Sequence, residues 1–139
     1  MKGINVYLTF DGNCKEAMTF YHKCLGGDLQ VHPFSQGPAD MAKGAGDRLM
    51  HASVTSGTSV VMASDSMPGM PVTAGNNFSI SVQCETDEEA DRLFGSLSEG
   101  GTAVMPMADQ FWGAYFGMLT DKFGINWMFN CEKAGAGAA

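Results

Sequence analysis

The chain has 139 residues, 45% of them hydrophobic, and carries 8 Lys and Arg against 15 Asp and Glu, for a formal net charge of −7. The apolar fraction argues against a disordered chain. The acidic balance argues against nucleic acid and membranes as partners, because no basic patch is available to contact phosphates. No stretch approaches the roughly 20 apolar residues that a membrane-spanning helix needs.

The N-terminus and the cysteines favour a cytoplasmic protein. The opening MKGINVYLTF enters an alternating pattern directly and lacks the apolar core and cleavage site of a signal peptide. The expected location is therefore the cytoplasm. The cysteines show no Cys-x-x-Cys spacing, which favours reduced thiols over a disulfide scaffold or a cysteine zinc site. They are Cys14, Cys24, Cys84 and Cys131.

The first predicted elements are a strand and a helix. Ile4–Phe10 alternates apolar and polar residues, as a half-buried strand does. Asn13 is an expected N-cap with Glu16 three residues later, which is the spacing of a capping box. Gly26-Gly27 ends the predicted helix.

Three extended segments complete the first module, predicted to cover residues 1–65. They are Asp28–Phe34, Arg48–Thr55 and Thr58–Asp65. Residues 36–47, rich in Gly, Ala and Pro, predict a loop over one end of the sheet. Residues 66–75, with two prolines, predict a linker.

The same order of elements returns in a second module, predicted over residues 76–132. Asn76–Val82 repeats the strand, Thr86 and Glu89 repeat the capping box, and Gly100-Gly101 ends the second helix. Residues 133–139 are of low complexity and predict a disordered tail. The last three extended segments are Thr102–Met107, Trp112–Leu119 and Ile125–Cys131.

Three segments carry a family resemblance. They are YLTFDGNCKEAMTFYHKCLGG (7–27), MHASVTSGTSVVMASD (50–65) and FWGAYFGMLTDKFGINWMFNCE (111–132), the last with its WG, LTDKFG and NW elements. Together they resemble the PhnB-like branch of the vicinal-oxygen-chelate superfamily, which includes glyoxalases, bleomycin-resistance proteins and dioxygenases. The resemblance implies an α+β fold in which two tandem βαβββ modules form a cupped mixed β-sheet with helices on the outside. It also implies a homodimer.

Some members of this branch are labelled demethylubiquinone methyltransferases. Nothing in the sequence resembles a glycine-rich loop that opens a βαβ nucleotide fold, so that label is not carried over.

The resemblance also implies where metal ligands would lie, namely on the first and last strands of each module. By alternation Tyr7 and Ser79 face the cup, and a count of four residues past Gly57 and Gly124 gives Val61 and Met128. None of the four is a histidine or a carboxylate, which divalent cations prefer, so we expect no family-type metal and no cofactor. A register shift of one residue offers nothing better: Val6, Met62, Ile80, and Trp127 or Phe129.

Two further residues are candidates for the cup. His51 lies in a predicted strand and is the candidate catalytic residue, although no second titrating group is tied to it by spacing. Tyr115 would give the cup a polar edge together with Tyr7. Alternation leaves open whether Tyr115 or the Trp112/Phe116 pair faces the cup.

Three functions remain open. The first is a protein that binds a small molecule in the cup without a family-type metal, through Tyr7, Val61, Ser79, Tyr115 and Met128. The second is an enzyme of glyoxalase or dioxygenase type, which would hold a divalent metal through unrecognised positions. The third is a non-catalytic structural homodimer.

Overall fold

The computed structural model describes residues 1–133, except for the side chain of Met41. Apart from Lys133, the predicted tail lies outside the described residues. The chain divides into two compact units, Met1–Thr73 and Ala74–Ala139, which are described separately below. None of the helices in the described part of the chain is long and apolar enough to cross a membrane.

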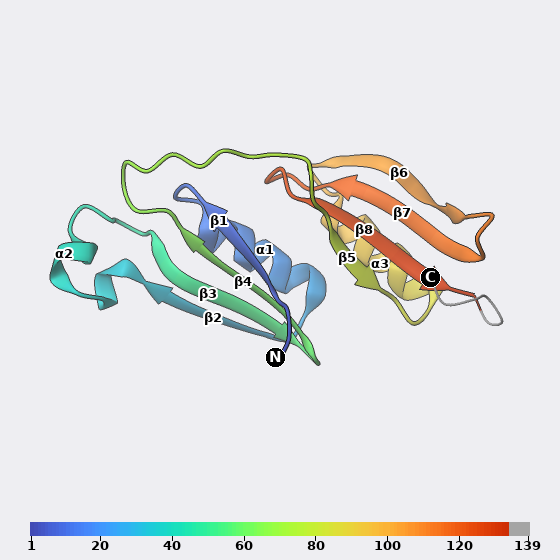
Figure 1. Ribbon diagram of the computed structural model, residues 1–139, viewed down its shortest axis with the longest axis horizontal. Helices are drawn as coiled ribbons and strands as arrows, with labels where there is room; N and C mark the ends of the chain where they lie inside the picture. The colour runs from blue at the N-terminus through green and yellow to red at the C-terminus, as the bar shows by residue number, and fades with distance from the viewer. Residues whose placement is uncertain (134–139) are drawn as a thin grey trace. The chain divides into compact units, whose positions relative to one another are not determined.

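Unit 1 is a four-stranded mixed sheet with one long helix (Figure 1). The strand order is β1-β4-β3-β2, in which β1 pairs with β4 in parallel and the other pairs are antiparallel. A 3₁₀ turn at Phe34–Gln36 and the short helix α2 (Ala39–Ala42) occupy part of the predicted loop. The main elements are β1 (Val6–Phe10), α1 (Cys14–Leu25), β2 (Asp28–Pro33), β3 (Leu49–Ser56) and β4 (Ser59–Asp65).

Unit 2 repeats this topology with the strand order β5-β8-β7-β6. Here β5 and β8 are the parallel pair, and the two remaining pairs are antiparallel. The predicted α+β fold of two βαβββ modules is thereby confirmed. The elements are β5 (Ile80–Gln83), α3 (Asp87–Leu97), β6 (Thr102–Asp109), β7 (Ala114–Thr120) and β8 (Asn126–Glu132).

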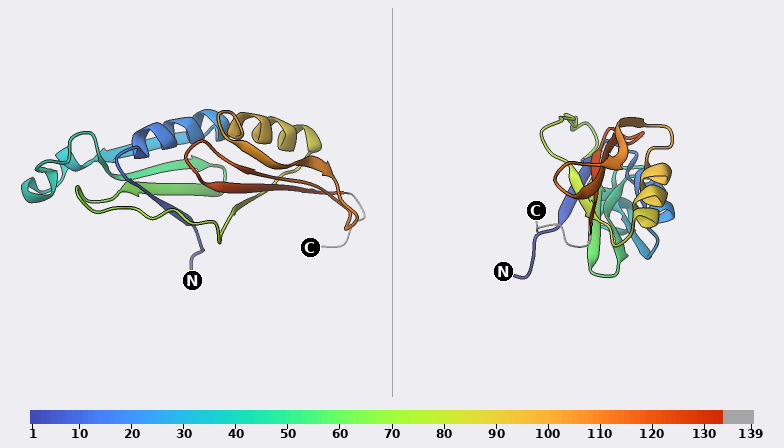
Figure 2. Two further views of the ribbon diagram at one scale, coloured as in Figure 1. Left: turned by 90° about the horizontal axis from the view of Figure 1, so that it is seen from above. Right: turned by 90° about the vertical axis from the view of Figure 1, so that its right-hand side faces the viewer.

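The long helices α1 and α3 each cover one face of the sheet in their own unit (Figure 2). We call this the helix face of the sheet, and the opposite side the open face. In unit 1 the fully buried Met18 and Tyr21 of α1 lie on the side of Leu8 and Val54. In unit 2 Leu97 of α3 shares the core with Trp127 and Phe129, which are also buried. Burial of these apolar side chains is the main stabilising contribution in each unit.

The glycine pairs that end the two helices also set the distance between helix and sheet. A Cβ atom on Gly27 would lie 2.0 Å from the carbonyl oxygen of Thr55, and one on Gly101 would lie 2.3 Å from that of Thr120. Only glycine permits such a close backbone approach. The second glycine of each pair therefore brings the chain leaving the helix directly against the neighbouring strand.

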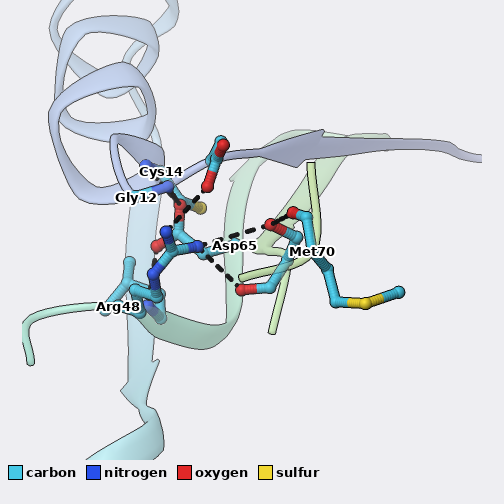
Figure 3. A network of polar contacts seen from close by, with 8 residues as sticks. Gly12, Cys14, Arg48, Asp65 and Met70 are labelled. Atoms are coloured by element: carbon cyan, nitrogen blue, oxygen red, sulfur yellow. Dashed lines mark hydrogen bonds and ion pairs between the residues drawn. The ribbon is translucent and has the colours of Figure 1, made fainter. Parts of the chain in front are cut away.

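A buried carboxylate organises the start of α1 (Figure 3). Asp65, at the end of β4, is 3% exposed. Its Oδ1 accepts hydrogen bonds from the backbone N–H groups of Gly12 (2.7 Å) and Cys14 (3.0 Å), and its Oδ2 accepts one from Leu49 (2.8 Å). Asp65 thereby caps the helix and joins it to the starts of β3 and the turn after β1.

The two predicted capping boxes have different outcomes. Asn13 makes no side-chain cap hydrogen bond, so the box predicted for α1 is wrong, since Asp65 takes this role from a distant strand. The cap predicted for α3 is confirmed, with the Thr86 hydroxyl accepting from Glu89 N–H at 3.1 Å. Glu89 in turn accepts from the N–H of Glu85, one residue before the cap.

Arg48 connects three segments around Asp65 (Figure 3). Its guanidinium donates to Asp11 at 2.7 Å and to the carbonyl oxygen of Ser66 at 2.9 Å. The Ser66 hydroxyl donates to the carbonyl oxygen of Met70. The end of β1 and the segment after β4 are therefore held at the same place as the start of β3.

We predict that Asp65→Ala lowers the free energy of unfolding of unit 1 by about 3 kcal/mol or more, because three N–H groups, two of them in buried hydrogen bonds, lose their acceptor. Urea denaturation followed by circular dichroism measures this loss. Asp11→Ala is the matched control: its side chain is 51% exposed, and its ion pair with Arg48 is expected to contribute less than about 1 kcal/mol. Equal losses in the two variants would contradict the assignment.

Candidate functional site

The open face of unit 1 carries Tyr7 of β1. The parallel register places Tyr7 opposite Met62 of β4, and the ring of Tyr7 is 48% exposed. The neighbouring pair Leu8 and Ala63 is buried on the helix face. The prediction that Tyr7 points away from the helix is therefore correct.

His51 lies on the same face and contacts Tyr7. The Tyr7 hydroxyl is 3.0 Å from Nδ1 of His51, within hydrogen-bonding distance, and the two ring centroids are 5.7 Å apart. Which atom donates depends on the histidine tautomer. The contact supplies the second titrating group that sequence spacing alone did not reveal.

A β-bulge lies directly before His51. In the pairing of β2 with β3, His32 lies opposite His51 and Pro33 lies opposite Leu49, so Met50 is an extra residue. Residues two positions apart in a strand normally face the same side of the sheet, but a bulge between them lets them face opposite sides. Leu49 is buried on the helix side at 1% exposure, whereas His51 contacts Tyr7 on the open face.

His32 completes what we call the histidine–tyrosine cluster, composed of Tyr7, His32 and His51. His32 is exposed on β2 and lies directly across the strand pair from His51. The two imidazole centroids are 6.1 Å apart and the ring planes differ by 24°, which is a stacked arrangement. Beside the cluster, Thr9 of β1 pairs with Ser64 of β4.

The open face of unit 2 has a different character. Three methionines from adjacent strands lie in register, with Met118 of β7 opposite both Met128 of β8 and Met105 of β6. Ser81 of β5 is the partner of Met128 on its other side. We call Met105, Met118 and Met128 the methionine row. A flexible, polarisable row of this kind suits apolar ligands of irregular shape.

Polar and aromatic groups border the methionine row. Asn130, which is 9% exposed, donates through Nδ2 to Oε1 of Gln83 at 3.0 Å. Phe116 lies opposite Asn130 and packs edge-on against Trp112, with ring centroids 5.6 Å apart. Trp112 and Phe116 therefore lie on the open face, and Tyr115 does not.

Tyr115 lies on the helix face, so its predicted place in the cup is wrong. Its hydroxyl donates to Oδ1 of Asp91 in α3 at 2.6 Å, and Lys133 Nζ lies 5.0 Å from its ring centroid. The hydrogen bond to Asp91 and, to a smaller extent, desolvation raise the pKa of Tyr115 to about 12. This tyrosine therefore joins strand to helix within unit 2.

Val61 also lies on the helix face, because the two modules turn differently before their last strands. Val61 is 8% exposed, and its neighbour Met62 is the residue that pairs with Tyr7. The first turn closes between Ser56 and Ser59, whereas the second closes between Thr120 and Asn126. Counting four residues from each turn glycine therefore reaches the open face only in the second module, at Met128.

Ser79 precedes β5, which begins at Ile80. The strand partner of Met128 is Ser81, which corresponds to Tyr7 opposite Met62 in the first module. The sequence repeat aligns Tyr7 with Ser79. By strand pairing, however, Tyr7 corresponds to Ser81, two residues later. The open-face pairs of the two modules are Tyr7 with Met62 and Ser81 with Met128.

The four cysteines are buried. Burial raises the pKa of Cys14 to about 12 and that of Cys84 to about 11. Both thiols therefore stay protonated at neutral pH and are poor nucleophiles. Within residues 1–133, no three His, Cys, Asp or Glu side chains are grouped so that they could hold a metal ion. The expected lack of a family-type metal stays a prediction.

The comparisons with known proteins identify the family. The family model described as 3-demethylubiquinone-9 3-methyltransferase matches residues 2–129. The chain belongs to this PhnB-like family. It is 33% identical to Protein YjdN of Escherichia coli K12 over 144 aligned residues, which cover 94% of this chain and 95% of YjdN.

Solved structures of relatives share the fold. Protein PA1353 of Pseudomonas aeruginosa is 42% identical, with a TM-score of 0.81 over 95% of this chain and all of that one. A Bacillus cereus protein described as a putative 3-demethylubiquinone-9 3-methyltransferase, PhnB protein, is 28% identical, with a TM-score of 0.75 over 92% and 98% of the chains. A glyoxylase/bleomycin resistance protein/dioxygenase domain of Frankia sp. EAN1pec, 15% identical, matches the fold at TM-score 0.71 over 97% and 95%. At 15% identity, this last similarity shows a shared fold.

We predict that Asp91→Asn lowers the pKa of Tyr115 from about 12 toward its usual value of about 10. A neutral amide no longer favours the protonated phenol over the phenolate. NMR chemical shifts of the tyrosine ring carbons, followed against pH, measure the change, and Tyr115→Phe assigns the signal. Asp40→Asn, in the other unit, should leave Tyr115 unchanged. An identical titration in wild type and Asp91→Asn would contradict the helix-facing position.

Proposed function

We propose that the protein binds a small organic molecule on the open faces of its sheets, without a metal at the family-type positions. The observation that carries the proposal is the histidine–tyrosine cluster. A phenol and two imidazoles meet on one sheet face, where Tyr7 and His32 are exposed to solvent. Such groups fix the orientation of a ligand, while surrounding apolar side chains supply most of the contact area.

Each open face also carries apolar methionine side chains. Met62 lies beside Tyr7 in unit 1, and the methionine row extends across three strands of unit 2. All four of these methionines are partly accessible rather than buried. A ligand that combines a hydrogen-bonding group with an apolar part would match the open face of unit 1, where Tyr7 and Met62 are adjacent.

An enzyme is the second candidate function, and the Tyr7–His51 contact favours it. A histidine next to a phenol is an arrangement that can transfer a proton to or from a bound ligand. The glyoxalase or dioxygenase type of chemistry would in addition need a divalent metal. Turnover by the wild type that is lost in His51→Gln, with ligand binding retained, would distinguish the enzyme from a binding protein.

Methyl transfer, named in the description of the family model, is not part of the proposal. The turn between β1 and α1 reads Asp11-Gly12-Asn13 and has a single glycine. A dinucleotide-type site would need a glycine-rich turn within a parallel βαβ unit.

We further propose that the protein is a cytoplasmic homodimer. Phe111 is 97% exposed and Trp112 is 45% exposed at the turn between β6 and β7, and exposed aromatic residues of this size are enriched at protein interfaces. The alternative of a structural homodimer without a ligand predicts the same assembly. Ligand binding therefore separates these two candidates, and the oligomeric state does not.

We predict that a chelator-treated sample binds compounds of a fragment library, with NMR shift changes at the backbone amides of β1, β3 and β4. Tyr7→Phe and Met62→Lys should each weaken binding about tenfold or more, or roughly 1.4 kcal/mol. Met67→Lys is the matched control, since Met67 is 41% exposed outside the strands.

Two outcomes would contradict the proposal. One is shift changes confined to positions outside the open faces. The other is binding that disappears on chelation and returns with a divalent metal, which would favour the metal-dependent enzyme instead.

A further inference from the structure

We infer that His32 and His51 form a binding site for a divalent transition cation of the nickel, copper and zinc group, with Tyr7 orienting His51. This inference goes beyond the proposed function and does not depend on it. The site lies on β2 and β3, whereas the family-type positions lie on the first and last strands of each module. It is therefore compatible with empty family-type positions.

The strand pairing places the two imidazoles together. His32 and His51 are directly opposite each other on antiparallel strands, and their ring centroids are 6.1 Å apart. Metal–nitrogen bonds are about 2.0–2.1 Å long, so one nitrogen of each ring can reach an ion between the two side chains once the rings rotate out of their stacked arrangement. Imidazole is a preferred donor for copper, nickel and zinc, and not for magnesium or calcium.

Tyr7 acts on His51 as a positioning residue. Its hydroxyl oxygen is 3.0 Å from Nδ1 of His51. If His51 donates this proton to the Tyr7 oxygen, Nε2 is left unprotonated and available to a metal. Histidine ligands commonly donate their other N–H to an oxygen acceptor in this way, which fixes both the tautomer and the ring orientation.

The electrostatic surroundings favour a cation. None of the four strands of the unit 1 sheet contains a lysine or an arginine. The paired Thr9 and Ser64 contribute neutral hydroxyl groups next to the cluster. The chain as a whole carries a formal net charge of −7, which raises the local concentration of cations.

Two protein ligands leave several coordination positions open. Structural zinc sites use four protein ligands and catalytic ones use three, so a two-histidine site is weaker and keeps bound water. A ligand oxygen or nitrogen can replace that water. The inferred site thus exchanges its metal readily and accepts a further donor from solution.

The test uses untagged, chelator-treated protein titrated separately with nickel and zinc chloride in a calorimeter. We expect one ion per chain, with binding weakened tenfold or more in His32→Ala, His32→Gln and His51→Ala. Tyr7→Phe should weaken binding by about tenfold, as loss of a partner to a metal-ligating histidine does. His22→Ala is the matched control, because this third histidine lies on α1 and contacts the Gly27 carbonyl oxygen instead.

Bound copper allows the chemical type of the ligating atoms to be identified. Electron paramagnetic resonance of the protein with one equivalent of Cu²⁺ should show hyperfine coupling to two imidazole nitrogens, and to one in His32→Ala. Thermal unfolding of each variant checks that the fold is retained. The inference is overturned if the wild type binds no ion, or if His32→Ala and His32→Gln bind as the wild type does. Fragment binding in the same chelated samples reports separately on the proposed function.

Discussion

The arrangement of unit 1 depends on one buried carboxylate. Asp65 accepts N–H groups from the turn after β1, the first residue of α1 and the first residue of β3. Hydrogen bonds to a charged acceptor are stronger than neutral ones, and burial of Asp65 excludes water as a substitute. Because β1 carries Tyr7 and β3 carries His51, this contact also fixes the end of β1 relative to the start of β3. The positions of the candidate-site residues therefore depend on Asp65, which is not itself part of the site.

Unit 2 reaches the same topology with different contacts. Cys131 occupies the strand end that Asp65 occupies in unit 1, and the cap of α3 comes from Thr86 next to the helix. The buried carboxylate of unit 2 is Asp121, before β8, which accepts from Phe123 and Ile125 N–H and from the indole of Trp127. The two modules therefore share a backbone path but not the side-chain contacts that stabilise it. Their side chains have diverged, with a polar cluster on one open face and methionines on the other.

The order and type of the elements could be predicted from the sequence, because alternation, caps and glycine stops are local signals. The faces of single residues could not all be predicted. Val61 was assigned to the wrong face because turns of different length precede the last strands of the two modules. Tyr115 was assigned to the wrong face because alternation does not say which set of residues meets the helix. The contact between His51 and Tyr7 depends on strand pairing across 44 positions, which leaves no local pattern.

The methionine row has a consequence for oxidative chemistry. Met105, Met118 and Met128 are partly accessible residues on adjacent strands, which exposes this surface to oxidants in solution. Conversion to the sulfoxide turns an apolar, flexible side chain into a polar and chiral one. One oxidation event at the centre of the row, Met118, would place a strong acceptor beside both neighbours. The oxidised surface would then favour ligands that carry hydrogen-bond donors. Methionine sulfoxide reductases could reverse the oxidation and restore the preference for apolar ligands.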